Sequence, residues 1–188
     1  MKKSAQGFTL VELLVVIAII AILAAVVVLI INPLELTRRG RDAARLSDLA
    51  NLQNAINVAV QEATGSGAVA VLCKVAAAYP CGGAADQGQS HVGPRAADGS
   101  GWVKSDLSSQ KSVSVPTLPI DPVNDTTLHY TYCADNDAWE IDTVLESEQQ
   151  KGKMANDGGN ENATDTTGRY EVGSKLTLIA PSGGSCTF

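Results

Sequence analysis

The sequence lacks the residue patterns that common catalytic and metal sites require. Its 188 residues include only two histidines, His91 and His129, and four cysteines, none of them in a Cys-x-x-Cys pair. No Ser-His-Asp order, phosphate-binding loop or histidine metal motif is present. We therefore do not expect the protein to be an enzyme.

Basic residues are also scarce. The chain has 14 Lys and Arg against 20 Asp and Glu, which gives a formal net charge of −6. A surface that binds nucleic acid generally needs the opposite balance, so no direct contact with nucleic acid is predicted. No internal repeat is visible. Roughly 120 residues follow the N-terminal helical region, which is enough for one small domain with a modest core.

The most informative segment is the N-terminus. A basic leader, MKKSAQG, precedes an apolar run of 24 residues at positions 8–31, which is interrupted by one charge, Glu12. As a helix this run spans about 36 Å, which is enough to cross a bilayer core of about 30 Å. A secretory signal peptide has a shorter apolar stretch followed by a cleavage site. A plain signal anchor fits the length but leaves Glu12 unexplained, because a charge within a bilayer is costly.

The sequence GFTLVE at positions 7–12 resembles the processing site of type IV prepilins and type II secretion pseudopilins. In that family a prepilin peptidase cuts after the glycine and methylates the new N-terminus. The resemblance implies cleavage between Gly7 and Phe8 and N-methylation of Phe8. It also implies an assembly role for Glu12, because the amine freed at Phe8 is cationic and lies one helical turn away.

The resemblance implies an α+β pilin fold, in which a long N-terminal α-helix packs on a small antiparallel β-sheet and a disulfide-linked region ends the chain. The expected segments are a leader at residues 1–7, a transmembrane and filament-core helix at 8–31, an amphipathic helix at 32–64 and an extracytoplasmic domain at 65–188. Within that domain we expect a variable loop at about 65–110 and the sheet and C-terminal region at about 111–188.

Local patterns support these segments. Pro33 predicts that the helix breaks or bends at Asn32-Pro33, because proline removes a backbone donor. Beyond it, apolar residues follow a helical spacing, and an ion pair between Arg38 and Asp42 is expected on the exposed side. Alternating residues at 128–133 and 139–145, separated by a turn at 134–137, predict a hairpin. Short strands are also expected at 170–172 and 176–179.

All four cysteines follow the apolar run, in the part of the chain that the resemblance places outside the cytoplasm. An even number in an exported domain favours two disulfides, for which three pairings are possible. We favour Cys73–Cys81, which closes a short loop, and Cys133–Cys186, which joins the C-terminal region to a strand, as pilins commonly do. A zinc site using His91 and His129 is the less favoured alternative.

No cofactor is expected, although calcium is a weak possibility. Major pseudopilins carry a calcium site in their C-terminal loops, and Asp121, Asn124 and Asp125 supply oxygen atoms of the kind that calcium binds. These residues do not match an EF-hand loop, and acidic residues are common in turns. They are therefore weak calcium candidates.

The resemblance implies a structural subunit, expected to be the major pilin of a type IV pilus. The alternatives are a type II secretion pseudopilin or a minor pilin, and, more distantly, a membrane-anchored extracytoplasmic enzyme or binding domain. The implied partners are identical subunits, the prepilin peptidase, an assembly ATPase, an inner-membrane platform protein and membrane lipid. The precursor is expected to span the membrane once with its N-terminus in the cytoplasm, and the assembled subunit to lie in an extracellular filament.

Overall fold

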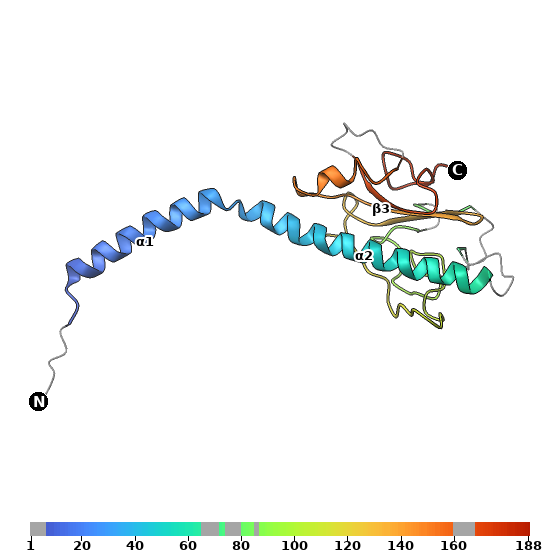
Figure 1. Ribbon diagram of the computed structural model, residues 1–188, viewed down its shortest axis with the longest axis horizontal. Coiled ribbons are helices and arrows are strands. Elements are labelled where there is room, and N and C mark those ends of the chain that lie inside the picture. The colour runs from blue at the N-terminus through green and yellow to red at the C-terminus, as the bar shows by residue number, and fades with distance from the viewer. Residues whose placement is uncertain (1–6, 65–71, 74–79, 85–86, 160–167) are drawn as a thin grey trace, which may run out of the picture. The chain divides into compact units, whose positions relative to one another are not determined.

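The computed structural model of the chain describes residues 7–64, 72–73, 80–84, 87–159 and 168–188. It divides into two compact units, Met1–Thr37 and Arg38–Phe188. Figure 1 shows the helices and strands in chain order. The expected α+β pilin architecture, with a long N-terminal apolar helix, a second helix, a small antiparallel sheet and a disulfide near the C-terminus, is confirmed.

The first unit contains helix α1 (Leu10–Ile30), which has no internal glycine or proline. Thr9 caps its N-terminus in an extended backbone conformation. The segment Leu10–Val28 has a mean hydropathy of 3.2, and none of it is buried. A helix that is apolar on all sides needs a surrounding apolar phase, and this one is long enough to cross a membrane.

Helix α2 (Pro33–Thr64) begins at the position where the sequence predicted a break. Its first residue, Pro33, occupies the position where a missing backbone N–H costs nothing. The Oδ1 atom of Asn32 accepts a hydrogen bond from the Glu35 backbone N–H at 3.3 Å, so Asn32 caps the new helix. The helical break at Asn32-Pro33 is confirmed, with each of the two helices capped at its own N-terminus.

The second unit is built on a four-stranded antiparallel sheet with the order β1-β2-β3-β4. Its strands are β1 (Cys81–Gly82), β2 (Thr131–Asp135), β3 (Ala138–Thr143) and β4 (Tyr170–Gly173). The predicted hairpin is formed by β2 and β3, whose last pair is Asp135 with Ala138. Asn136 lies in the turn with a φ of 55°, a conformation that asparagine tolerates better than most residues. The 3₁₀ helix η1 (Lys151–Lys153) lies between β3 and β4.

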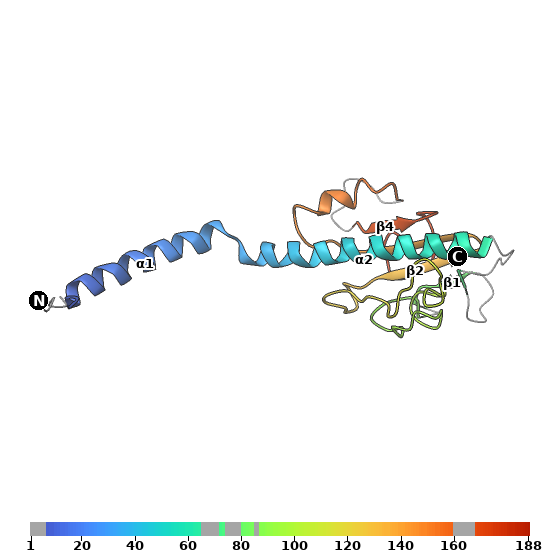
Figure 2. The ribbon, with the colours of Figure 1, turned by 60° about the horizontal axis from the view of Figure 1, so that its bottom comes forward.

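Helix α2 covers one face of this sheet, as both views show (Figures 1 and 2). Apolar residues of α2 at helical spacing and alternate residues of the strands form one core cluster. The loop residue Trp102 is fully buried in the same cluster and donates a hydrogen bond from its Nε1 to the Pro119 carbonyl at 3.0 Å. The principal helix and strand members are Leu49, Leu52, Ala55, Ile56, Tyr132, Trp139 and Ile141, and Tyr130, directly before β2, joins them.

The other face of the sheet is covered by the C-terminal segment 176–188. Cys133, Leu178 and Ile179 form a second apolar cluster there. The expected strand at 176–179 is wrong, because only Ile179 makes a single bridge, to Cys186. The reason is a long-range contact: the backbone N–H groups of Leu178 and Ile179 donate to the Glu140 carboxylate, at 2.6 and 3.0 Å.

Candidate processing and assembly site

The junction between Gly7 and Phe8 lies outside α1, in non-helical backbone. The Phe8 side chain is 86 % exposed, and a Cβ added to Gly7 would meet nothing within 4 Å. A peptidase needs an extended, accessible peptide bond. The two residues of the predicted cleavage site therefore present a bond that an enzyme can reach, one residue before the helix cap.

Glu12 is held by the N-terminus of its own helix. Its Oε2 atom accepts hydrogen bonds from the Thr9 backbone N–H at 2.8 Å and from the Thr9 hydroxyl at 2.7 Å. The Glu12 N–H donates in return to the Thr9 hydroxyl at 3.3 Å, which completes a capping box. A carboxylate at this end of a helix is also favoured by the helix dipole. The charge that looked isolated in the sequence is thus satisfied within its own chain.

Cleavage after Gly7 would place a cationic amine close to this carboxylate. Only three covalent bonds separate the Phe8 nitrogen from the Thr9 nitrogen, which already donates to Glu12. The same carboxylate is exposed on the helix surface, so it could also reach the amine of another subunit. The arrangement can therefore form an ion pair either within one chain or between two chains.

The rest of α1 presents large apolar side chains in every direction. Leu13, Leu23 and Val28 are 59 %, 59 % and 65 % exposed, and they lie at different angles around the helix. Lipid, or other helices of the same kind, must cover such a surface in water or membrane. The apolar surface of α1 therefore needs lipid or other apolar helices around it.

The second unit contains a buried ionic cluster, which we call the Arg45 cluster, made of Arg41, Asp42, Arg45, Asp121 and Glu146. The guanidinium of Arg45 binds both oxygens of Asp121, at 2.6 and 2.9 Å, and also contacts Asp42 and Glu146. Arg41 makes two further hydrogen bonds to Glu146, both 2.6 Å long. These bonds hold the pKa of Glu146 at about 2, below its ordinary value.

The Arg45 cluster was not predicted. Asp42 was expected on the exposed side of its helix in a pair with Arg38, but it is fully buried and pairs with Arg45 at 2.8 Å. The backbone N–H groups of Glu146 and Ser147 also donate to Asp42. Asp42 and Arg45 are three residues apart on α2, but their other partners lie 76 to 105 residues away along the chain, so helical spacing contains no signal for those contacts.

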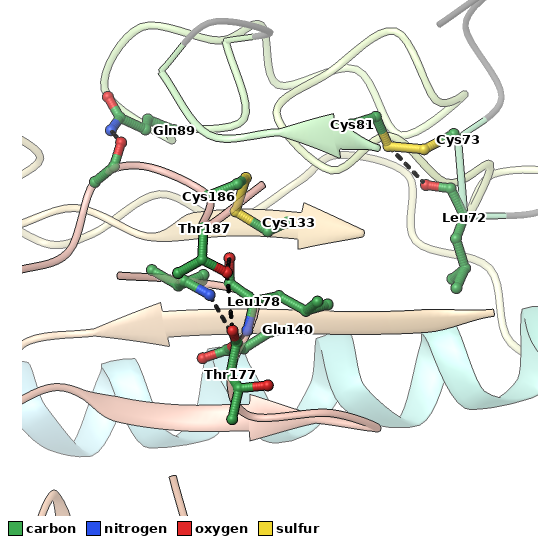
Figure 3. The surroundings of a disulfide bond; sticks show 12 residues. Leu72, Cys73, Cys81, Gln89, Cys133, Glu140, Thr177, Leu178, Cys186 and Thr187 are labelled. Atoms are coloured by element: carbon green, nitrogen blue, oxygen red, sulfur yellow. Dashed lines mark hydrogen bonds between the residues drawn. A yellow bond between two sulfur atoms is a disulfide. The ribbon is translucent and has the colours of Figure 1, made fainter. Parts of the chain in front are cut away.

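Two disulfides close the second unit, Cys73–Cys81 and Cys133–Cys186, which are the pairings favoured from the sequence. Figure 3 shows Cys186 joined to Cys133 on β2, with the segment that contains Leu178 and Thr187 beside Glu140 of β3. The Thr187 N–H donates to the Leu178 carbonyl at 2.8 Å. The C-terminal segment is thus fixed to the sheet both covalently and by hydrogen bonds.

The three weak calcium candidates are already engaged by the protein. Asp121 binds Arg45 and accepts a hydrogen bond from the Val123 N–H, and Asn124 accepts one from the Ser90 hydroxyl. Asp125 accepts hydrogen bonds from the N–H groups of Thr127 and Leu128. Within the described ranges no group of three or more His, Cys, Asp or Glu residues is placed to hold a metal ion.

An accessible Gly-Phe junction, a carboxylate in the first turn of an apolar helix, and a disulfide-closed α+β domain are all features expected of a pilin-like precursor. Residues 2–28 match the family model for the prokaryotic N-terminal methylation motif, the signature of type IV pilin and pseudopilin prepilins. This match supports a type IV pilin-like or pseudopilin prepilin. No curated protein and no solved structure matches the chain.

Proposed function

We propose that the protein is the major subunit of a type IV pilus. The observation that carries this proposal is α1, whose apolar surface is exposed on all sides and is preceded by the methylation motif. Such a helix can be covered first by lipid and then by identical helices in a filament core, where the same apolar surface is buried again. No second partner surface is needed if copies of α1 cover one another.

In this proposal the precursor spans the membrane once, with Lys2 and Lys3 on the cytoplasmic side. A prepilin peptidase removes residues 1–7 and methylates Phe8. An assembly ATPase, acting through an inner-membrane platform protein, then moves the subunit from the membrane into the filament. The ion pair between Glu12 and an N-terminal amine fixes the axial position of each incoming subunit, because an unpaired carboxylate in an apolar core is costly.

A pseudopilin of type II secretion or a minor pilin is the second candidate, since both share the methylation motif. We favour the surface filament because the domain is closed by two disulfides, which suit a subunit that stays exposed outside the cell.

The test is to shear filaments from cells that express the chain, image them by electron microscopy and measure the intact mass of their main subunit. The expected mass is that of residues 8–188 with one added methyl group. Gly7→Glu should leave the full precursor in the membrane and abolish filaments, whereas Gly40→Ala, also at a glycine with open space around it, should leave filaments unchanged.

Filaments made of another subunit, with this chain present only in traces, would contradict the major-pilin assignment. Loss of protein secretion without loss of surface filaments, after deletion of the chain, would favour the pseudopilin. A main subunit that starts at any residue other than methylated Phe8 would refute the processing site.

A further inference from the structure

A polar cavity of about 580 Å³ lies in the second unit, between the start of β2 and the C-terminal segment. It is lined by the two histidines of the chain, by hydroxyl groups and by glycines of the 182–184 turn. The described lining residues include no Asp or Glu. Their identities are Gln89, His91, Thr126, Thr127, His129, Val144, Arg169, Ser182, Gly183 and Gly184.

The two imidazole rings lie next to each other in this cavity. Their centroids are 4.4 Å apart and the ring planes are tilted by 46°. His129 is only 3 % exposed. Its Nε2 atom and the Nδ1 atom of His91 are both buried, and neither has a hydrogen-bond partner in the described structure. Two buried, unsatisfied nitrogens on adjacent rings are costly unless a ligand occupies them.

The tautomer of His129 is set by its other nitrogen. Nδ1 lies 3.1 Å from the Asp125 backbone carbonyl, which can only accept a hydrogen bond. Nδ1 therefore carries the proton, and Nε2 presents a lone pair to the cavity. Histidines that bind metals typically donate their second N–H to a carbonyl or carboxylate in this way.

The surrounding charges permit a cation. Arg169 also lines the cavity, but it is ion-paired with Asp142, and its Nη2 donates to Asp142 Oδ1 at 3.1 Å. The Asp125 carboxylate lies close enough to interact electrostatically with both histidines. Asp125, Asp142 and Arg169 together contribute a net charge of −1, so their sum does not exclude a divalent cation.

We propose that His91 and His129 form a two-histidine site for a divalent transition-metal ion of the zinc class. Neutral imidazole nitrogen suits Zn²⁺, Cu²⁺ and Ni²⁺, whereas two imidazole nitrogens without a lining carboxylate are a poor ligand set for the oxygen-seeking Ca²⁺ or Mg²⁺. His91 Nδ1 and His129 Nε2 are the two protein ligands, and water completes the coordination. The ion joins the loop that contains His91 to the segment that precedes β2, beside the C-terminal segment.

The experiment uses the full chain in detergent, without a histidine tag, after treatment with a chelator. Zn²⁺ is titrated by isothermal calorimetry, and the two imidazole side chains are followed by ¹H-¹⁵N NMR. We expect one equivalent of Zn²⁺ to bind and both rings to shift. His91→Gln and His129→Gln should each weaken binding by at least about tenfold. Ca²⁺ should produce no shift of either ring.

Asp137→Asn is the matched control, because Asp137 is an exposed carboxylate in the β2–β3 turn and should not affect the site. Unchanged zinc binding in both histidine variants would overturn the proposal and assign the binding to surface carboxylates. Absence of binding by the original chain would also overturn it. Far-UV circular dichroism of the metal-free variants checks folding, and the partly exposed His91 keeps the test valid if His129→Gln does not fold.

Discussion

At the scale of single residues, Arg45 links α2 by ion pairs to two other segments of the second unit. Its guanidinium is fully buried and contacts three carboxylates, which come from α2, from the segment before β2 and from the segment after β3. A buried pair of this kind adds little compared with apolar packing, but removing one partner leaves uncompensated charge. The stability of the fold therefore depends on all charged partners of the Arg45 cluster being present together.

Arg45→Met should lower the free energy of unfolding by about 3–5 kcal/mol, because Asp42 and Asp121 would stay buried without their cation. Denaturant unfolding of the full chain in detergent measures the change. Arg39→Met, on an exposed position of the same helix, is the control and should change the stability by less than about 1 kcal/mol. Similar losses for the two variants would mean that the Arg45 cluster has no special role.

Glu12→Ala should leave cleavage intact, since the Gly7–Phe8 junction is exposed and lies outside the helix. Assembly should fall by at least about tenfold, because the N-terminal amine of the subunit loses its partner. The measurement is the amount of subunit in the sheared filament fraction relative to cleaved subunit in the membrane. Glu148→Ala, at an exposed carboxylate, serves as the control. Equal filament yields from Glu12→Ala and the control would refute the ion-pair role.

The residue scale also shows where sequence reasoning fails. Glu12 could be recognised because it is the one charge in an apolar run. Asp42 could not, because a charged residue on an amphipathic helix is ordinarily exposed, and only partners far along the chain bury it. Local spacing predicts which side chains share a helix face, but not which distant backbone amides will reach that face.

At the scale of elements, β3 and β4 carry polar residues on the face away from α2, and that face is buried. Glu140 and Asp142 are fully buried and Glu171 is 3 % exposed. Alternation in the sequence predicted the hairpin correctly. It could not show that the C-terminal segment covers the second face, because that covering depends on the Cys133–Cys186 disulfide and on two backbone bonds to Glu140.

Burial here changes how two carboxyl groups titrate. Burial raises the pKa of Glu140 to about 7, and burial together with the neighbouring Glu140 raises the pKa of Glu171 to about 9. Asp142 and Asp157 add negative charge beside Glu171. The folded state therefore holds protons that the unfolded state, with an ordinary value of 4.5, has lost. Stability is greatest at low pH within this window and falls as the pH rises through the folded-state values.

Glu171→Gln should accordingly reduce this alkaline loss of stability. We expect the original chain to lose at least about 1 kcal/mol between about pH 6 and about pH 9, and the variant to lose clearly less. Thermal unfolding of the full chain across this range measures both slopes. Glu148→Gln, at an exposed carboxylate, should keep the original slope. Parallel pH profiles for Glu171→Gln and the original chain would show that the buried pair does not control the alkaline transition.

The two disulfides should differ in their contribution. Cys133–Cys186 joins residues 53 apart in the sequence and Cys73–Cys81 joins residues 8 apart. On the chain-entropy account, removing the first costs about 4 kcal/mol and removing the second about 2.5 kcal/mol. Paired Cys→Ser variants, compared by denaturant unfolding, test this order. A larger loss from Cys73→Ser with Cys81→Ser would show that the entropy of loop closure does not decide the order.

At the scale of the whole molecule, a few local patterns in the sequence predicted the main elements of the fold. The methylation motif covers only residues 2–28, yet it is the strongest support for a pilin-like precursor. The helical break at Asn32-Pro33 and the β2–β3 hairpin follow from proline chemistry and alternation. The Arg45 cluster and the histidine cavity depend on long-range packing of irregular segments, and nothing in local periodicity encodes such packing.

The Cys133–Cys186 bond can form only late in biogenesis. Cys186 follows every strand of the sheet, so the translating chain presents Cys73, Cys81 and Cys133 before the last partner emerges. Three thiols without their fourth can form only one bond, and two of the three choices are wrong. If the domain is exported as we propose, thiol oxidation outside the cytoplasm can begin before Cys186 is available. A subunit that then forms one of the two wrong bonds is mispaired before it can enter a filament.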